Sequence, residues 1–199
     1  MNINLDKYFW EHKYKNFQTG WDLGSISEPL KKYIDQLKNK NIRILIPGAG
    51  NGYEAEYLLK KGFKNVTVLD IAKVPLDNLK RRIQDLNDVN CIQQDFFKHQ
   101  GLYDLILEQT FFCALKPMLR EKYIDKMHEL LGSKGKLVGV LFNIEFDKEG
   151  PPFGGNIIEY KKLFEKHFNM HTIAPCYNSV KPRDGNELFV IFEKNTLYG

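Results

Sequence analysis

The sequence predicts an α/β fold in which helices cover both faces of a mostly parallel, doubly wound sheet. Strand-like apolar runs alternate with helix-like segments along most of the chain. A cluster of glycines follows the first strand-like run, and an aspartate ends the second. Because alternating strands and helices form right-handed βαβ crossovers, the strands are expected to lie parallel with helices packed on both faces.

Six strands are expected from short apolar runs, at residues 42–47, 65–70, 91–94, 103–107, 136–142 and 187–193. Helical segments are expected at residues 53–61, 75–86, 118–131 and 157–167. Gly62 is a natural C-terminal cap for the first helix, and Leu86 belongs to the apolar face of the second. Residues 168–170 have the pattern of a helix end that leads into another strand.

The length of the chain bounds its domain organisation. The 199 residues are enough for one well-buried core and too few for two ordinary domains. We therefore predict a single domain over residues 1–199, with its core at 42–194. Residues 5–38 precede this core and are expected to form one or two helices over it, joined by the loop at 18–29. We interpret residues 1–38 as an N-terminal helical lid.

Charge and apolar patterning exclude several classes of protein. The formal net charge is +4, and the basic residues are mixed with acidic ones, which argues against a nucleic-acid partner. The longest apolar runs have strand length, so no membrane span is expected, and the N-terminus lacks a signal-peptide pattern. We predict a cytoplasmic monomer. The three cysteines and five histidines show no metal-ligand spacing, so no metal is expected.

The glycine turn carries the strongest chemical signal. Gly48, Gly50 and Gly52 alternate in a GxGxG pattern after the first strand, and Asp70 ends the second strand 18 residues after Gly52. A dinucleotide site would place glycine or alanine where Tyr53 stands, so that helix and strand can pack around a pyrophosphate. The spacing therefore favours S-adenosylmethionine, which has no pyrophosphate, with Asp70 available to bind ribose hydroxyls.

A series of motifs extends this pattern over nearly the whole chain, from about Trp10 to Phe192. In order they are Trp10-Glu11, Gly20-Trp21-Asp22, the loop at 46–54, Gln94-Asp95-Phe96-Phe97, Tyr103-Asp104-Leu105-Ile106, Phe111-Phe112-Cys113-Ala114-Leu115 and Gly150-Pro151-Pro152-Phe153. Together they resemble the thiopurine methyltransferase family, and most closely its plant and bacterial thiol and halide methyltransferases. The resemblance implies a Rossmann-like class I methyltransferase with a seven-stranded sheet and an N-terminal lid.

The resemblance also implies roles for individual residues. Gly48, Gly50 and Gly52 are expected at the methionine end of the cofactor, Asp70 and Ile71 at the ribose, and Asp95 and Phe96 at the adenine. Trp10, Tyr14 and Trp21 match a segment that closes over the cofactor, although relatives often have tryptophan at the position of Tyr14. Glu108, Phe111 and Phe112, expected just past the fourth strand, should face the reacting centre, and Glu108 is also expected to contact the cofactor. Residues 24–29 lack an arginine that relatives often carry before a threonine-proline pair. The resemblance therefore does not predict binding of an anion such as a halide by these residues.

This chemistry would depend on placement. The methyl group of a sulfonium is already activated, so the protein must align the nucleophile and exclude water. Aromatic faces attract the sulfonium cation, and the candidates are Trp10, Trp21, Phe111, Phe112 and Phe153. A thiolate or halide needs no general base. Glu108 could orient the substrate or could equally be a carboxylate that backbone groups hold at the strand end. Cys113 has no visible base beside it and is interpreted as a buried packing residue.

The sequence thus predicts a small-molecule methyltransferase that uses S-adenosylmethionine, releases S-adenosylhomocysteine and acts on a soft nucleophile by in-line displacement. Thiols, sulfide and thiopurines are the expected acceptors, with halides as further candidates. The alternatives are methylation of another small molecule, of a protein or of a nucleic acid, and a cofactor-binding module without catalysis. The last is disfavoured by the complete set of cofactor motifs.

Overall fold

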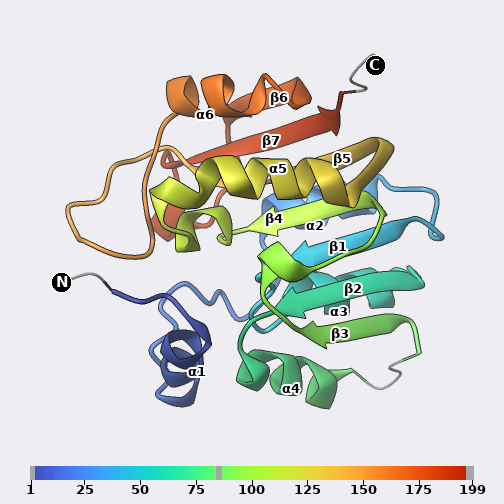
Figure 1. The fold of residues 1–199 in the computed structure, drawn as a ribbon. Coiled ribbons are helices and arrows are strands. Elements are labelled where there is room, and N and C mark those ends of the chain that lie inside the picture. Colours follow the sequence, from blue (N-terminus) through green and yellow to red (C-terminus); the bar gives the residue numbers. More distant parts are fainter. Residues whose placement is uncertain (1–2, 84–86, 196–199) are drawn as a thin grey trace.

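The described residues, 3–83 and 87–195 of a computed structural model, form a seven-stranded sheet in the order β3-β2-β1-β4-β5-β7-β6 (Figure 1). The strands are β1 (Arg43–Pro47), β2 (Asn65–Asp70), β3 (Val89–Gln93), β4 (Tyr103–Gln109), β5 (Leu131–Phe142), β6 (Phe168–Pro175) and β7 (Glu187–Lys194). Neighbours from β3 to β5 pair in parallel, and β7 runs antiparallel to both β5 and β6. The predicted doubly wound, mostly parallel sheet is confirmed.

Helices cover both faces of this sheet, as the alternating pattern predicts. On one face lie α2 (Glu28–Asp35), α3 (Tyr53–Lys60) and α4 (Lys73–Arg82), and on the other α5 (Arg120–Leu130) and α6 (Ile157–Phe164). Successive residues of one strand face opposite layers: Ile44 and Ile46 pack with the first group, and Leu45 packs with the second. Within the described chain, every helix is too short or too polar to cross a bilayer.

Several predicted boundaries differ from the structure for identifiable reasons. β6 is a full strand, although the sequence pattern indicated only its first residues. The apolar signal is weak there because β6 lies at the sheet edge and its residues are mostly half-exposed or exposed. β4 continues to Gln109, so Glu108 lies inside the strand and not beyond it. β5 begins at Leu131, through a stretch that is partly exposed. Leu86, expected on the α4 face, lies outside the described residues.

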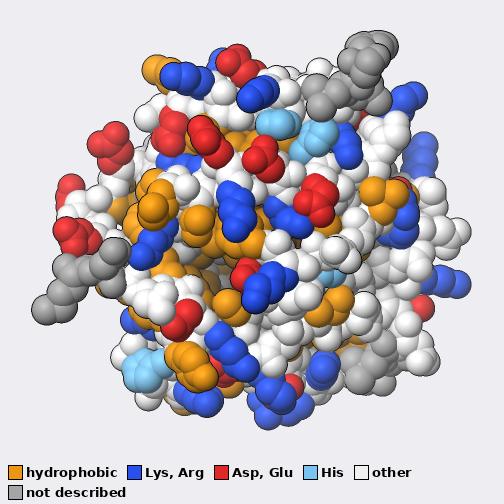
Figure 2. Space-filling model, in the orientation of Figure 1, with side chains coloured by type: hydrophobic (Ala, Val, Ile, Leu, Met, Phe, Trp, Pro, Cys, Tyr) orange, Lys and Arg blue, Asp and Glu red, His pale blue; other side chains and the backbone are white. Residues whose placement is uncertain are grey.

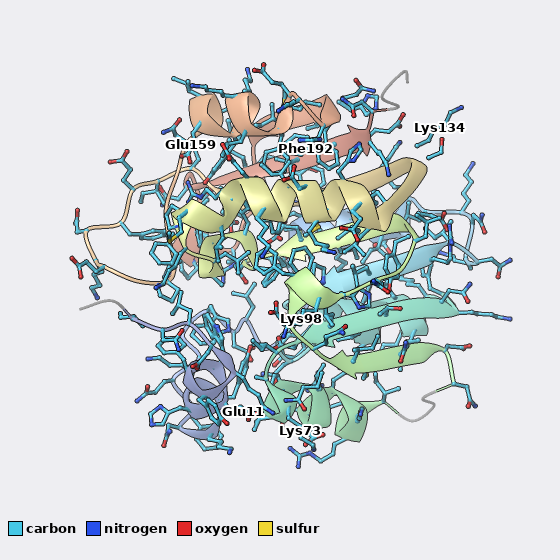
Figure 3. The ribbon with its side chains drawn as sticks, viewed as in Figure 1. Glu11, Lys73, Lys98, Lys134, Glu159 and Phe192 are labelled. Atoms are coloured by element: carbon cyan, nitrogen blue, oxygen red, sulfur yellow. The ribbon has the colours of Figure 1, made fainter. Side chains whose placement is uncertain are left out.

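The N-terminal region divides into two parts. α1 (Lys7–Lys15) has no buried residue and lies in front of the carboxyl ends of the strands (Figure 1). It is tied to α4 because the Lys73 backbone N–H donates to Glu11 Oε1 at 2.6 Å, and the two residues lie together in Figure 3. α2, by contrast, buries Leu30 and Ile34 completely. Of the segment interpreted as a lid, only α1 and the loop after it therefore lie outside the core.

Candidate active site

A cavity of about 890 Å³ lies at the carboxyl ends of β1, β2 and β4. This is the switch point of the sheet, because the chain continues from β1 to β2 on one side and later returns to β4 on the other. Ligands of open α/β sheets bind at such points. In the space-filling view, hydrophobic side chains gather around a hollow on the left of this face (Figure 2).

The glycine turn brings bare backbone to the cavity wall. Gly48 and Gly50 have φ of 56° and 55°, a region that side chains rarely adopt. A Cβ at Gly48 would lie 2.1 Å from Phe111 Cδ2, and a Cβ at Gly50 would lie 2.7 Å from the Tyr14 hydroxyl oxygen. Both positions line the cavity, so a ligand can approach their backbone closely.

Gly52, the third glycine of the turn, packs against α4. It precedes α3 with φ of 67° and does not line the cavity. A Cβ there would lie 2.7 Å from Leu79 Cδ2, on α4. The missing side chain of Gly52, which was expected at the methionine end of the cofactor, therefore lets α3 begin against α4.

Asp70 joins the glycine turn to the start of α4. Its Oδ2 accepts the Gly50 N–H at 2.8 Å, and its Oδ1 accepts the Ala72 N–H at 2.8 Å. Each carboxylate oxygen has two lone pairs, so both can accept a further hydrogen bond from a hydroxyl in the cavity. Burial raises the pKa of Asp70 to about 6, while the two N–H donors oppose that shift. Ile71, also expected at the ribose, lines the cavity beside it.

Three aromatic residues from α1 and the following loop form another wall. The Trp10 and Trp21 rings pack edge to face with centroids 5.5 Å apart, and Tyr14 packs on Trp21 in the same way at 5.9 Å. Burial and the nearby Asp70 charge raise the pKa of Tyr14, so its hydroxyl remains a neutral donor. The three predicted residues of the closing segment thus lie together over the glycine turn.

The opposite side of the cavity is built from residues that follow β3 and β4. Asp95 caps a short 3-10 helix by accepting the Phe97 N–H at 2.9 Å. Phe96 lies beside it and packs edge to face with Phe111 at 5.1 Å. Asp95 and Phe96, expected at the adenine, and Phe111, expected at the reacting centre, all line the cavity.

Glu108 and Phe112, which were expected at the reacting centre, are not among the residues that line this cavity. Glu108 is 1% exposed; its Oε1 accepts the Phe111 and Phe112 N–H groups, and its Oε2 accepts the Tyr123 hydroxyl at 2.6 Å. Burial raises the pKa of Glu108 to about 7. Phe112 packs among Tyr123, Tyr160 and Phe164 in the core. Glu108 is therefore a strand carboxylate that shapes the loop carrying Phe111.

The remaining part of the cavity, which we call the distal chamber, comes from the loops after β4 and β5 and from the turn before β7. Its walls are Cys113, Leu115, Phe142, Phe146, Pro151, Pro152 and Arg183. Phe153, a predicted aromatic contact, lies instead at a smaller neighbouring cavity. Cys113 Sγ donates to the Thr110 carbonyl at 3.2 Å, and burial raises the pKa of its thiol, which agrees with an inert role.

Arg183 was not anticipated from the sequence. It is 8% exposed and lines the cavity. Its Nη2 donates to the Trp21 carbonyl at 2.7 Å, and its Nη1 pairs with Glu187 Oε1 at 3.5 Å. It lies in a short 3-10 turn (Lys181–Arg183) with no motif around it, so only the tertiary structure brings its charge to the site. Glu54, at the start of α3, was also missed as a site residue although it belongs to the glycine-turn motif.

These features fit S-adenosylmethionine. Gly48 and Gly50 would lie against its methionine end, Asp70 would accept from its ribose, and Asp95 with Phe96 would border its adenine. The cofactor supplies a methyl group that its positive sulfur activates for transfer. Aromatic faces around the cavity suit that positive charge. No group of three or more potential metal ligands occurs among the described residues.

The fold and the cavity define a Rossmann-like S-adenosylmethionine-dependent methyltransferase. Solved structures of that class share the fold: a Burkholderia thailandensis 1,6-didemethyltoxoflavin-N1-methyltransferase with bound S-adenosylhomocysteine has a TM-score of 0.76 at 18% identity, covering 96% of this chain and 87% of that one. The magnesium protoporphyrin IX methyltransferase of Synechocystis with bound S-adenosylhomocysteine has a TM-score of 0.73 at 13% identity, covering 96% and 100%.

Within that class, the chain belongs to the thiopurine S-methyltransferase (TPMT) family, whose model matches residues 5–196. It is 29% identical over 195 residues to the "Probable thiol methyltransferase 2" of Arabidopsis thaliana, covering 95% of this chain and 86% of that protein. It is 26% identical to thiocyanate methyltransferase 1 of Brassica oleracea, covering 89% and 81%. The thiopurine S-methyltransferase of Acinetobacter baylyi is 22% identical, covering 96% and 95%. The predicted family is confirmed.

Proposed function

We propose that this methyltransferase transfers the methyl group of S-adenosylmethionine to the sulfur of a small thiol, with sulfide and thiopurines in the same acceptor class. The observation that carries the proposal is the distal chamber, where the buried Arg183 lines the cavity together with apolar and aromatic residues. A thiolate is a soft anion that loses little by leaving water for such walls, and a fixed cation beside it favours the ionised form.

Arg183 is held so that its charge can serve this purpose. Its contacts with the Trp21 carbonyl and Glu187 set the guanidinium plane, and it also lies over the Phe142 ring, 5.7 Å from the centroid. An arginine clamped in this way does not have to reorganise when an anion binds. The names of the relatives, which include thiol, thiocyanate and thiopurine methyltransferases, support the same acceptor class.

Halides form a second candidate class. Residues 24–29 lack the arginine on which the family resemblance would place an anion contact, but Arg183 offers a cation from a different part of the chain. We therefore include iodide and thiocyanate among the acceptors to be tested. We further propose that the enzyme works as a cytoplasmic monomer on free small molecules, without a nucleic-acid partner.

The test is an acceptor screen with methyl-labelled S-adenosylmethionine. The panel contains sulfide, alkyl and aryl thiols, thiopurines, iodide and thiocyanate, with an amine, an alcohol, an oligonucleotide and a protein mixture as controls. We expect methylated product from at least one thiol and none from the controls. Turnover of an amine, an oligonucleotide or a protein in the absence of thiol turnover would contradict the proposal, and light scattering in solution checks the monomer.

A further inference from the structure

Glu54 is a buried carboxylate that faces the cavity without a partner of its own. It lies in the first turn of α3, is 6% exposed and lines the cavity next to the glycine turn. Among the described residues, no side chain forms a hydrogen bond or an ion pair with its carboxylate, which has only its own backbone N–H. A buried carboxylate normally has such partners, so this one is available to a group inside the cavity.

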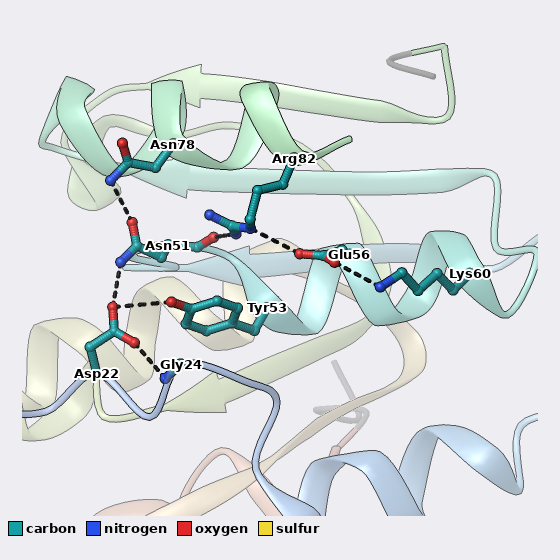
Figure 4. A network of polar contacts seen from close by, with 8 residues as sticks. All are labelled: Asp22, Gly24, Asn51, Tyr53, Glu56, Lys60, Asn78 and Arg82. Atoms are coloured by element: carbon teal, nitrogen blue, oxygen red, sulfur yellow. Dashed lines mark hydrogen bonds and ion pairs between the residues drawn. The ribbon is translucent and has the colours of Figure 1, made fainter. Parts of the chain in front are cut away.

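The charged groups around Glu54 are already engaged. Asp22, which faces it from the loop before α2, accepts the Gly24 N–H at 2.7 Å and hydrogen bonds from Asn51 and Tyr53 (Figure 4). Arg183, which faces it from the distal chamber, is bound to Trp21 and Glu187.

The helices packed against α3 bring no further charge to this carboxylate. Asp35 of α2 binds Tyr57 and Lys61, and Arg82 of α4 binds Glu56 on the solvent side of α3 (Figure 4). Among the described carboxylates that line the cavity, Glu54 is thus the one that accepts no hydrogen bond from another residue.

We propose that the Glu54 carboxylate accepts the proton of the thiol acceptor, an inference that rests on the proposed thiol methylation. The S–H bond breaks and its electron pair stays on sulfur, while a new O–H bond forms on Glu54. That electron pair would make the new bond between the acceptor sulfur and the methyl carbon. The bond from the methyl carbon to the sulfonium sulfur of S-adenosylmethionine would break at the same time, and its electron pair would stay on the sulfur of the departing S-adenosylhomocysteine. The proton leaves Glu54 for solvent after the products depart, so the carboxylate is regenerated.

The charge arrangement favours this transfer. The proton moves from sulfur to Glu54 inside the cavity, so the net charge is unchanged, and the thiolate forms near the Arg183 cation. The pKa of Glu54 is raised to about 7, mainly by burial and also by the Asp22 charge, while its own backbone N–H and Arg183 oppose the shift. A base whose pKa lies near neutral pH combines a useful ionised fraction with a favourable proton affinity.

An alkyl thiol, whose pKa is about 8.5 or higher, should report this base through its pH profile. In the wild type, kcat/KM should rise up to about pH 7, where Glu54 ionises, and then stay level until the thiol itself ionises. In Glu54→Gln, only thiolate already present in solution can react, so kcat/KM should climb about tenfold per pH unit up to the thiol pKa. Near pH 7 the variant should be slower by about 10²-fold.

An aryl thiol that is ionised throughout this range, such as para-nitrothiophenol, should show the opposite dependence. Its thiolate has no proton to give and is repelled by an ionised Glu54. Wild-type kcat/KM should therefore fall about tenfold per pH unit above pH 7, whereas Glu54→Gln should be flat. Glu54→Asp should keep the wild-type shapes at a lower rate, and Glu56→Gln, on the same helix but facing solvent, should match the wild type.

Binding without turnover gives an independent readout. Calorimetry of para-nitrothiophenolate with the S-adenosylhomocysteine complex at pH 8, in buffers of different ionisation enthalpy, should show uptake of about one proton per thiolate in the wild type and in Glu56→Gln. Glu54→Gln should take up none. A second titration, of S-adenosylhomocysteine into the free protein, measures the affinity for the cofactor product. This affinity should change less than threefold in Glu54→Gln.

The outcomes separate this inference from the proposed function. If no thiol is methylated at any pH, thiol methylation itself is wrong. If thiols are methylated but the wild-type profile climbs with thiolate concentration, and no proton is taken up on binding, Glu54 is not the acceptor of the proton. A large loss of S-adenosylhomocysteine affinity in Glu54→Gln without proton uptake would also overturn the inference and assign Glu54 to the cofactor.

Discussion

At the scale of single residues, three buried carboxyl groups illustrate how contacts decide chemistry. Asp70, Glu54 and Glu108 are each less than a tenth exposed, and burial raises the pKa of all three. Glu108 uses both oxygens on the loop that carries Phe111, whereas Asp70 keeps lone pairs toward the cavity. Glu54 has its oxygens free. Similar burial therefore accompanies a structural group in Glu108, an expected cofactor contact in Asp70 and a candidate proton acceptor in Glu54.

Asp70→Asn should weaken binding of S-adenosylhomocysteine by about 10-fold or more. The amide keeps the shape of the carboxylate, but its NH₂ group must face either Gly50 N–H or Ala72 N–H, so the glycine turn shifts and one charged acceptor is lost. Hydrogen bonds to charged groups contribute about 1.5–3 kcal/mol. Calorimetry measures the affinity, and Asp77→Asn, which changes a partly exposed side chain of α4, is the control. NAD should not bind the wild type, and NAD binding more tightly than S-adenosylhomocysteine would contradict the cofactor assignment.

Arg183→Met should lower kcat/KM for thiols by about 10-fold or more, because the thiolate loses the cation that lies beside it. Affinity for S-adenosylhomocysteine should change little. Lys181→Met, two residues away on the exposed side of the same turn, is the matched control. Unchanged thiol turnover in Arg183→Met would show that the guanidinium serves only to hold the Trp21 backbone.

At the scale of elements, α1 and the loop to Trp21 form the least buried wall of the site. α1 buries none of its residues, and its attachment to the core depends on the Glu11 contact with the start of α4 and on aromatic packing among Trp10, Tyr14 and Trp21. Elements with few buried contacts open with little free energy. A bound cofactor would add contacts to this wall, so binding and ordering should be coupled.

S-adenosylhomocysteine should therefore slow limited proteolysis within residues 1–28 and change the fluorescence of Trp10 and Trp21. Glu11→Ala removes the acceptor of the Lys73 N–H. This change should speed the cleavage of the free protein and lower its affinity for S-adenosylhomocysteine several-fold. Lys15→Ala, exposed on the same helix, should do neither. Equal cleavage rates with and without saturating ligand would count against a lid.

At the scale of the whole molecule, the buried carboxyls make stability depend on pH. A carboxyl whose folded pKa is raised binds its proton more tightly in the folded state, so its contribution is present below the unfolded pKa and is lost as pH rises through the folded one. For Glu54 and Glu108 that window runs from 4.5 to about 7, and for Asp70 from 3.8 to about 6. The ion-paired Asp77 and Asp35 have lowered pKa values. Their contribution to stability is lost only as the pH falls below about 3.8, outside the range of the buried carboxyls.

The cofactor-free protein should accordingly unfold at a higher temperature at pH 5 than at pH 8. Each unit of pKa difference corresponds to about 1.4 kcal/mol, so the effect should be easily visible by calorimetry. Glu54→Gln should raise the melting temperature at pH 8 and flatten the dependence, because no charge is then buried at that position. Burial lowers the pKa values of His99 and His128, and these two groups act in the opposite direction in the wild type and in the variant alike. A melting temperature at pH 8 that is no higher in Glu54→Gln than in the wild type would therefore contradict the assignment of Glu54.

The sequence by itself determined the class of the protein, because its signals are local. Alternating strands and helices, the spacing of Gly48 and Gly50, and Asp70 at a strand end need no distant contact to be recognised, and they led to the sheet, the cofactor and the family. The glycine spacing could not separate Gly50, which borders the cavity, from Gly52, which packs against Leu79.

Only the tertiary structure decided which side chains meet in the distal chamber. Phe111 and Phe112 are adjacent in sequence, but the turn after β4 directs the first into the cavity and the second into the core. Arg183 reaches the site across 162 residues from Trp21, and no periodic pattern encodes such a meeting. Whether a carboxylate such as Glu54 or Glu108 is free depends on partners from other elements, and folding alone brings those partners within hydrogen-bonding distance.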